Sequence, residues 1–199
     1  MAIFYRGAGI GTYWHLNNPL ERGFIARSPG MESTTTRLMD HIARSTVNSP
    51  FISLTRSYGV AWHYAMSSST RPPTSSQPAY VHEIEIQEPL PRGLKLLDPV
   101  KEVVQTLALP TEPGPPYQHD GLPSFLIGIV DPGNMEHFLA QRAMQPPTSE
   151  GIPRTPNLTI ELETLVRALR DSEILVHGII PATCVKNSFD VYPELQLSE

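Results

Sequence analysis

The pattern of apolar and polar residues marks the strands of this chain more clearly than its helices. Residues 80–87 alternate strictly, with Tyr80, His82, Ile84 and Ile86 on one side and Val81, Glu83, Glu85 and Gln87 on the other. This period of two predicts a half-buried strand. Short apolar runs predict further strands at 2–6, 51–55, 94–97, 125–130, 173–180 and 183–191.

Helices are predicted where apolar residues recur every three or four positions, in segments 31–47, 56–66 and 159–170. Two more are predicted where an aspartate supplies the N-cap and a proline the first residue, from Asp98 to about 108 and from Asp131 to about 144. Because the helices do not alternate strictly with the strands, the pattern favours an α+β fold over a doubly wound sheet.

Proline clusters set the expected loops. The chain has 199 residues, which fits one domain over 1–199, and 21 prolines, about twice the usual ~5%. The prolines gather in three segments, predicting loops at about 67–79, 110–123 and 145–158.

Charge and cysteine usage exclude some classes of protein. The net charge is -5 and 18% of residues are charged, so the composition is not that of a basic nucleic-acid binder. A local patch of Arg37, Arg44, Arg56 and Arg71 stays open as an alternative. Cys184 stands alone, which excludes an internal disulfide.

The sequence contains no apolar run of about 18 residues, so no transmembrane helix is predicted. The first residues have neither the basic segment nor the apolar segment of a secretory signal. The sequence therefore predicts a cytoplasmic protein, or one delivered into a target cell without a signal peptide, with no membrane partner.

Three predicted strands carry residues capable of chemistry. Arg6 ends the first strand within Phe4-Tyr5-Arg6-Gly7. Ser53 and Thr55 lie two residues apart in Phe51–Thr55, so their hydroxyls share a face. Glu173 opens a late strand, two residues after Asp171.

In this order and spacing, the three stretches resemble the arginine–serine–glutamate pattern of mono-ADP-ribosyltransferases, the family of cholera-type and clostridial toxins and of arginine-specific vertebrate enzymes. The resemblance runs in outline from Arg6 to Pro181 and rests on three short motifs. It implies an ADP-ribosyltransferase-like core of two packed, mostly antiparallel sheets with flanking helices.

The resemblance also implies an activity: an NAD-dependent glycosyltransferase that moves ADP-ribose to a macromolecular acceptor, protein or nucleic acid, and releases nicotinamide. NAD is then the substrate, and no metal is implied. A toxin or effector is the expected setting, with an antitoxin or immunity protein as a further partner.

The family pattern assigns roles to individual residues. Glu173 would be the catalytic carboxylate, stabilising the oxocarbenium ion and binding a ribose hydroxyl. Arg6, with Gly7 beside it, would bind the pyrophosphate, whose oxygens match a guanidinium fork. Ser53 would orient Glu173 or the ribose, with Thr55 supporting it.

Two assignments are less direct. Family members have glutamate at the position of Asp171 when the acceptor is arginine, and glutamine for several other acceptors, so Asp171 is a candidate general base that leaves the acceptor open. Residues 161–170 would correspond to the acceptor-recognition loop. Nicotinamide is a flat ring on which an aromatic side chain can stack, and the candidates are Tyr58, Trp62 and Tyr64.

Other interpretations stay open. Taken singly, Arg6, Ser53 and Glu173 are ordinary strand residues. The same fold could serve an NAD glycohydrolase, or a non-catalytic interaction module. His82 and Glu85 lack metal-ligand spacing. Cys184 with His177 could suggest a thiol nucleophile, but a single cysteine in an apolar setting is more often inert.

Overall fold

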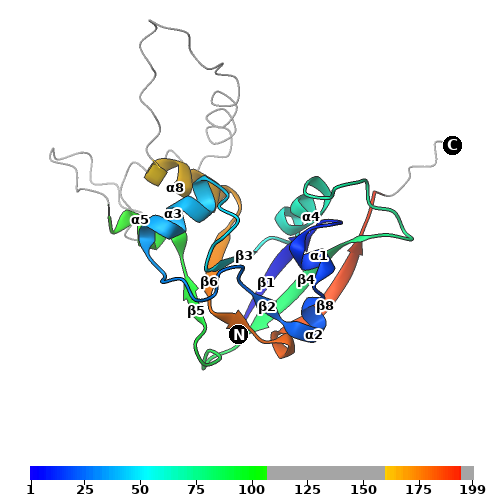
Figure 1. The fold of residues 1–199 in the computed structure, drawn as a ribbon, viewed down its shortest axis with the longest axis horizontal. Coiled ribbons are helices and arrows are strands. Elements are labelled where there is room, and N and C mark those ends of the chain that lie inside the picture. The colour runs from blue at the N-terminus through cyan, green and yellow to red at the C-terminus, as the bar shows by residue number, and fades with distance from the viewer. Residues whose placement is uncertain (107–159, 194–199) are drawn as a thin grey trace, which may run out of the picture.

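The computed structural model describes residues 1–106 and 160–193. The strand predicted at 125–130, the helix from Asp131 and the loops at 110–123 and 145–158 lie outside these residues. Within them, a six-stranded antiparallel sheet has the order β5-β6-β3-β1-β4-β8 (Figure 1). Its strands are β1 (Ala2–Ala8), β3 (Phe51–Thr55), β4 (Ala79–Ile86), β5 (Lys95–Leu97), β6 (Glu173–His177) and β8 (Val185–Val191). A second ladder pairs β2 (Phe24–Ile25) with β7 (Ile179–Ile180).

Helices connect and cover these strands. They are α1 (Tyr13–Leu16), α2 (Pro19–Arg22), α3 (Thr35–Ala43), α4 (Tyr58–Ser67), α5 (Pro99–Val104) and α8 (Ile160–Arg170), with a 3-10 turn at Ala182–Cys184. Three helices begin at a side-chain N-cap: Thr34 for α3, Ser57 for α4 and Asp98 for α5. Each capping side chain accepts a hydrogen bond from a backbone N–H in the first turn of its helix. The predicted Asp98 cap is therefore confirmed.

The large sheet consists of two three-stranded halves. Strand β1 pairs with β4 along its whole length, from Ala2 to Ala8, but with β3 only at Tyr5 opposite Thr55. Figure 1 shows β5, β6 and β3 diverging from β1, β4 and β8 beyond this point. Side chains from both halves form one apolar cluster, which includes Phe4, Ile52, Ile84 and Val176. The halves therefore pack face to face, and the predicted α+β class is confirmed.

Helices cover the two outer faces. On one side, α3, α5 and α8 pack on β3 and β6 through a cluster that includes Leu38, Val103, Leu165 and Leu175. On the other side, α4 packs on β1, β4 and β8, with Ala61 against Val81 and its neighbours. The prediction that Val81 lies on a polar face is therefore wrong, because α4 covers the start of β4.

Several predicted elements have different ends in the structure. The first strand, predicted to end at Arg6, continues to Ala8, and the helix from Asp98, predicted to reach about 108, ends at Val104. The helix predicted over 31–47 is shorter, because Thr34 caps its start and Ser45 adopts a positive φ of 52° beyond its end. The strand predicted over 173–180 breaks into β6 and β7 at Gly178, where a Cβ would lie 2.4 Å from the Gly93 carbonyl oxygen. The strand predicted from Thr183 starts later, after a 3-10 turn.

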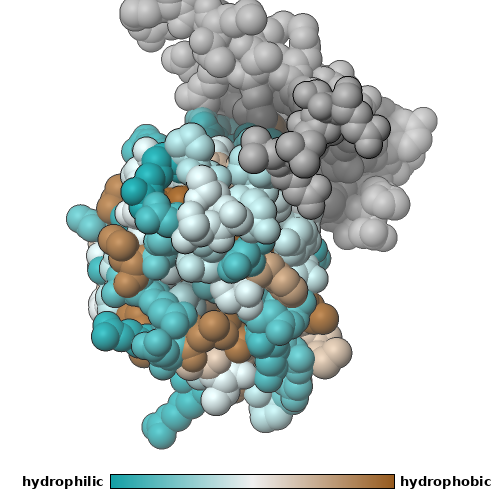
Figure 2. Space-filling view, turned by 90° about the vertical axis from the view of Figure 1, so that its right-hand side faces the viewer, coloured by the Kyte–Doolittle hydropathy of each residue, from teal (hydrophilic) through white to brown (hydrophobic). Residues whose placement is uncertain are grey.

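On the face of the molecule nearest β8, hydrophobic side chains form separate groups among hydrophilic ones (Figure 2). Among the helices of the described residues, none has both the length and the apolar character needed to cross a membrane.

Candidate active site

A cleft of about 400 Å³ lies between the two halves of the molecule, where β1 and β3 separate beyond the Tyr5–Thr55 pair. Residues of β1, β3, α3, α4, β6 and the end of α8 line it. The predicted site residues among its lining are Arg6, Gly7, Ser53, Thr55, Tyr64, Asp171 and Glu173. The fold thus brings together residues from three distant parts of the sequence.

Glu173 is the first residue of β6 and pairs with Thr55 across the β3–β6 ladder. Burial raises the pKa of its carboxyl group to about 7. A hydrogen bond with the Ser53 side chain opposes this shift, Asp171 adds to it, and the Arg6 and Arg170 charges oppose it. A carboxyl group poised near neutrality can exchange a proton during a reaction.

Ser53 is held by a residue that the sequence did not indicate. His41 of α3 places its Nε2 atom 2.8 Å from the Ser53 Oγ. Burial, with a smaller contribution from the Arg6 charge, lowers the pKa of His41 to about 4, so the imidazole is neutral at pH 7. The Ser53 hydroxyl has a single proton. Because it donates that proton to Glu173, it must accept from His41, which places the imidazole proton on Nε2.

Arg6 extends from β1 toward β3, where its Nη1 donates to the backbone carbonyl of Ser53. Its guanidinium lies over the Trp14 ring, 5.6 Å from the centroid. Burial lowers the pKa of Arg6 to about 10, with Glu173 opposing and Arg27 adding to the shift, so the group stays cationic at pH 7. Its buried Nε has no hydrogen-bond partner among the described residues, which leaves a donor for a ligand.

A second cation stands near Arg6. Arg27 is exposed, also lines the cleft, and lies over the Tyr13 ring, 5.3 Å from the centroid. It forms no ion pair with any residue that the structure describes. Two guanidinium groups on one cleft suit a ligand with more than one anionic group.

The turn before Glu173 is fixed by the end of β3. The Thr55 Oγ1 donates to the Asp171 carbonyl at 2.5 Å, and the Arg56 N–H donates to the Ser172 carbonyl at 3.2 Å. Ser172 has a positive φ of 47°, which the turn requires. Thr55 therefore fixes the backbone from which Glu173 extends.

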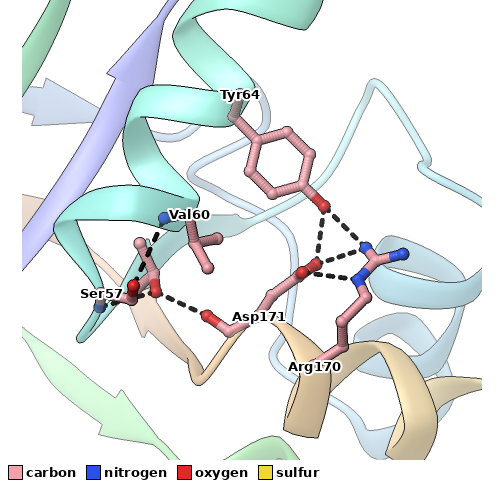
Figure 3. Close-up of polar contacts among 6 residues, drawn as sticks. Ser57, Val60, Tyr64, Arg170 and Asp171 are labelled. Atoms are coloured by element: carbon pink, nitrogen blue, oxygen red, sulfur yellow. Dashed lines mark hydrogen bonds and ion pairs between the residues drawn. The ribbon is translucent and has the colours of Figure 1, made fainter. Parts of the chain in front are cut away.

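The Asp171 carboxylate is not free. Arg170 donates to both of its oxygens, at 2.7 Å from Nε and 2.7 Å from Nη2, and the Tyr64 hydroxyl donates to Oδ2 at 2.6 Å. Figure 3 shows Tyr64 reaching from α4 toward Asp171 and Arg170 at the end of α8. Burial and the Asp171 contact raise the pKa of Tyr64 to about 12, so its proton stays in place. A carboxylate with these partners is a poor general base.

The remaining predicted residues have other contacts. A Cβ at Gly7 would lie 2.1 Å from the Ala61 carbonyl oxygen, so this glycine lets α4 approach β1. Tyr58 packs edge-on between Tyr5 and Phe189, with ring centroids 5.6 and 5.8 Å away. Tyr58 and the exposed Trp62 are not among the residues that line the cleft.

The alternative chemistries find no support in the described residues. They contain no group of three histidine, cysteine or acidic side chains able to hold a metal ion. Cys184 packs against the main apolar cluster, whereas the His177 Nε2 contacts the Met31 carbonyl at 3.3 Å.

Three functional candidates lacked a clear signal in the sequence. His41 is three residues after Leu38 and one before Ile42, so it lies on the buried side of a predicted helix, and a polar residue there is a usable signal. Arg27 lies in an irregular segment, and Arg170 resembles any helix-ending cation. Only the fold shows that these residues line one cleft.

No family model matches the sequence of this chain. No curated protein matches it either. Among solved structures, full-length CARDS toxin is similar over 94% of this chain, at 16% sequence identity and a TM-score of 0.44. The nicked form of CARDS toxin gives the same three values. The chain spans 24% and 25% of the length of these two structures, and at this TM-score the likeness does not establish a shared fold.

Proposed function

We propose that this chain is an NAD-dependent mono-ADP-ribosyltransferase. The observation that carries the proposal is the meeting of Arg6, Ser53 and Glu173 in one cleft, from three strands far apart in sequence. The order and identity of these residues are those of the arginine–serine–glutamate family, and their contacts suit the chemistry of NAD cleavage.

The reaction breaks the bond between ribose C1′ and the nicotinamide nitrogen, and positive charge develops on the ribose. The ionised Glu173 carboxylate would stabilise this charge and accept a hydrogen bond from a ribose hydroxyl. Ser53, held by His41, would keep the carboxylate oriented. Such a fixed group acts without reorganising during the reaction.

The cleft also carries the charge that a dinucleotide requires. Its described lining has four arginines and two carboxylates, although the whole chain has a net charge of -5. Of these four arginines, Arg6 and Arg27 have no carboxylate partner among the described residues, so we assign them to the pyrophosphate. Local positive charge in an acidic protein favours an anionic ligand.

The proposed acceptor is a macromolecule, either protein or nucleic acid, and the chain would act as a toxin or effector. A second function, NAD glycohydrolase, has one observation in its favour. Asp171, the residue suited to assist an acceptor, is held by Arg170 and Tyr64, which leaves water as the nucleophile that needs the least assistance.

The test measures nicotinamide release and ADP-ribose transfer with labelled NAD, alone and with a cell lysate. We expect Glu173→Gln to lower both by about 100-fold or more while NAD still binds. Glu83→Gln is the matched control, because the Glu83 side chain accepts a hydrogen bond from Asn187 at 2.8 Å and does not line the cleft. Full activity of the Glu173 variant would sink the proposal.

Two further measurements distinguish the transferase from a glycohydrolase and from a non-catalytic module. Free ADP-ribose without any adduct would favour the glycohydrolase, and digestion of an adduct with protease or nuclease would give the acceptor class. Absence of heat and of a thermal shift with NAD would favour a non-catalytic module.

A further inference from the structure

The cluster of Tyr64, Arg170 and Asp171 has a consequence for the acceptor. Asp171 lies two residues before Glu173 and lines the same cleft, beside the carboxylate that the proposed function places at the ribose. Only 13% of its side chain is exposed, against 38% for Arg170. Both carboxylate oxygens already accept charged hydrogen bonds from one guanidinium.

A bidentate guanidinium–carboxylate pair is the strongest arrangement these two groups can form. The Asp171 contact raises the pKa of Arg170 further above its ordinary value. Arg170 also donates to the Tyr64 hydroxyl at 2.9 Å, which itself donates to Asp171. A cationic acceptor would have to displace this guanidinium and would meet its positive charge, an unfavourable approach.

We propose that Arg170 is a specificity-determining residue: it occupies the Asp171 carboxylate, excludes guanidinium and ammonium acceptors, and leaves this side of the cleft to uncharged nucleophiles. The proposal rests on the proposed function for its substrate, NAD, but the occupied carboxylate is a property of the chain alone.

In the transfer that Arg170 suppresses, an acceptor nitrogen forms a bond to ribose C1′ as the bond from C1′ to nicotinamide breaks. The bonding electrons leave with nicotinamide, which becomes neutral, and the acceptor nitrogen releases one proton. Asp171 would hold a guanidinium acceptor for this step only if Arg170 were removed.

The probe is agmatine, a small molecule with a guanidinium group. We expect the wild-type protein to give free ADP-ribose as its main product and only a trace of agmatine adduct. In Arg170→Leu, the ratio of adduct to free ADP-ribose should rise about ten- to hundredfold, the range expected for a charged hydrogen bond. Arg170→Lys, which keeps the positive charge, should behave like the wild type.

Two controls separate this effect from a general change of charge. Arg167→Leu removes a guanidinium from the same helix and the same cleft lining, but Arg167 pairs with Glu163 at 2.9 Å, so the ratio should not change. The double variant Arg170→Leu with Asp171→Asn should lose the gain, because the carboxamide carries no charge.

A second readout does not require turnover. Without NAD, agmatine should raise the melting temperature of Arg170→Leu, and not that of the wild type or the double variant. Agmatine adduct as the main product of the wild type, or no gain in both readouts for Arg170→Leu, overturns the proposal. If no variant cleaves NAD, the proposed function fails, and the thermal readout still decides whether Arg170 blocks a guanidinium site.

Discussion

The His41 imidazole and the Ser53 hydroxyl lie 2.8 Å apart, Nε2 to Oγ, and join helix α3 to strand β3 inside the cleft. Burial keeps the pKa of His41 at about 4, so at pH 7 the ring is neutral and has one N–H. That N–H fixes the Ser53 oxygen as an acceptor and directs the hydroxyl proton toward Glu173. His41 is therefore a positioning residue that acts through Ser53.

Replacement of His41 should lower turnover more than binding. We expect His41→Leu to reduce kcat for NAD cleavage about tenfold, the effect of losing one buried hydrogen bond, with little change in KM. His41→Gln should recover part of the loss, because an amide N–H can reach the same oxygen. Equal kcat values for the leucine variant and the wild type would exclude this role.

The elements of the fold were largely predictable, because local pattern determines them. Strand β3 has the bounds that its apolar run predicts, and Asp98-Pro99 opens α5 as expected. The errors have tertiary causes. Val81 is buried because helix α4 packs over it, and the strand predicted over 173–180 breaks because the backbone at Gly93 approaches Gly178.

The residues of the candidate site were also predictable only where local sequence pattern determines them. Arg6, Ser53 and Glu173 were predictable because each stands on a strand within a known order of residues, and all three line the cleft. For His41 the only signal was its place on the buried side of a predicted helix, and for Arg27 there was none, because their approach depends on how α3 and the segment after β2 fold back. The engagement of Asp171 by Tyr64 joins residues 107 positions apart, which no local pattern encodes.

Arg6 should not be replaceable by lysine. Lysine keeps the charge but lacks the planar guanidinium fork. In Arg6 this fork contacts the Ser53 carbonyl and also presents an Nε donor to the cleft. We expect Arg6→Lys to weaken NAD binding about tenfold in calorimetry, whereas Arg22→Lys, in the exposed helix α2, should have no effect. Wild-type affinity in Arg6→Lys would remove Arg6 from the pyrophosphate site.

Glu173 should destabilise the protein at alkaline pH. Burial raises its pKa from 4.5 in the unfolded chain to about 7 in the folded one, so ionisation costs free energy only in the fold. The stability associated with the neutral form is present below about pH 4.5 and lost as the pH rises through 7. Glu173→Gln should therefore raise the free energy of unfolding by about 2 kcal/mol near pH 8, after allowance for partial exposure, and leave it unchanged near pH 4.

Chemical denaturation at the two pH values measures this difference. The same pKa predicts that wild-type NAD cleavage rises between about pH 6 and pH 8, because the carboxylate is the active form. An increase in stability of equal size at both pH values would show that packing, and not ionisation, causes the effect.

His82 should make the protein sensitive to acid. Its side chain is 2% exposed, its ring nitrogens have no partner among the described residues, and Phe24 lies against it at 5.6 Å. Burial, with smaller contributions from Arg6 and His15, lowers its pKa from 6.5 to about 4. The unfolded chain thus binds a proton first, and stability falls as the pH drops below about 6.5.

The loss expected from His82 is about 2 kcal/mol between pH 7.5 and pH 5. His82→Leu should remove that part of the pH dependence, measured as the free energy of unfolding at both pH values. His41 also lowers the stability of the protein as the pH falls, and it is unchanged in this variant. A residual slope of the free energy of unfolding against pH is therefore expected. The exposed His63 gives the control, His63→Gln, and an unchanged slope in His82→Leu would contradict the assignment.

Gly7→Ala should separate α4 from the sheet. The added Cβ would lie 2.1 Å from the Ala61 carbonyl oxygen and 2.7 Å from the Ala65 nitrogen, both backbone atoms of α4 that cannot rotate away. We expect a loss of about 2–3 kcal/mol in the free energy of unfolding. Gly59→Ala is the control within the same helix, because the nearest atom to its Cβ is 3.8 Å away. Helix propensity should make that variant about 0.5–1 kcal/mol more stable.

Since α4 also carries Tyr64, Gly7→Ala should loosen the Tyr64–Asp171 contact. A shift of the pKa of Tyr64 in the folded protein toward its ordinary value would report this change. A fully stable Gly7→Ala variant with an unchanged Tyr64 titration would mean that the strand, and not the helix, gives way.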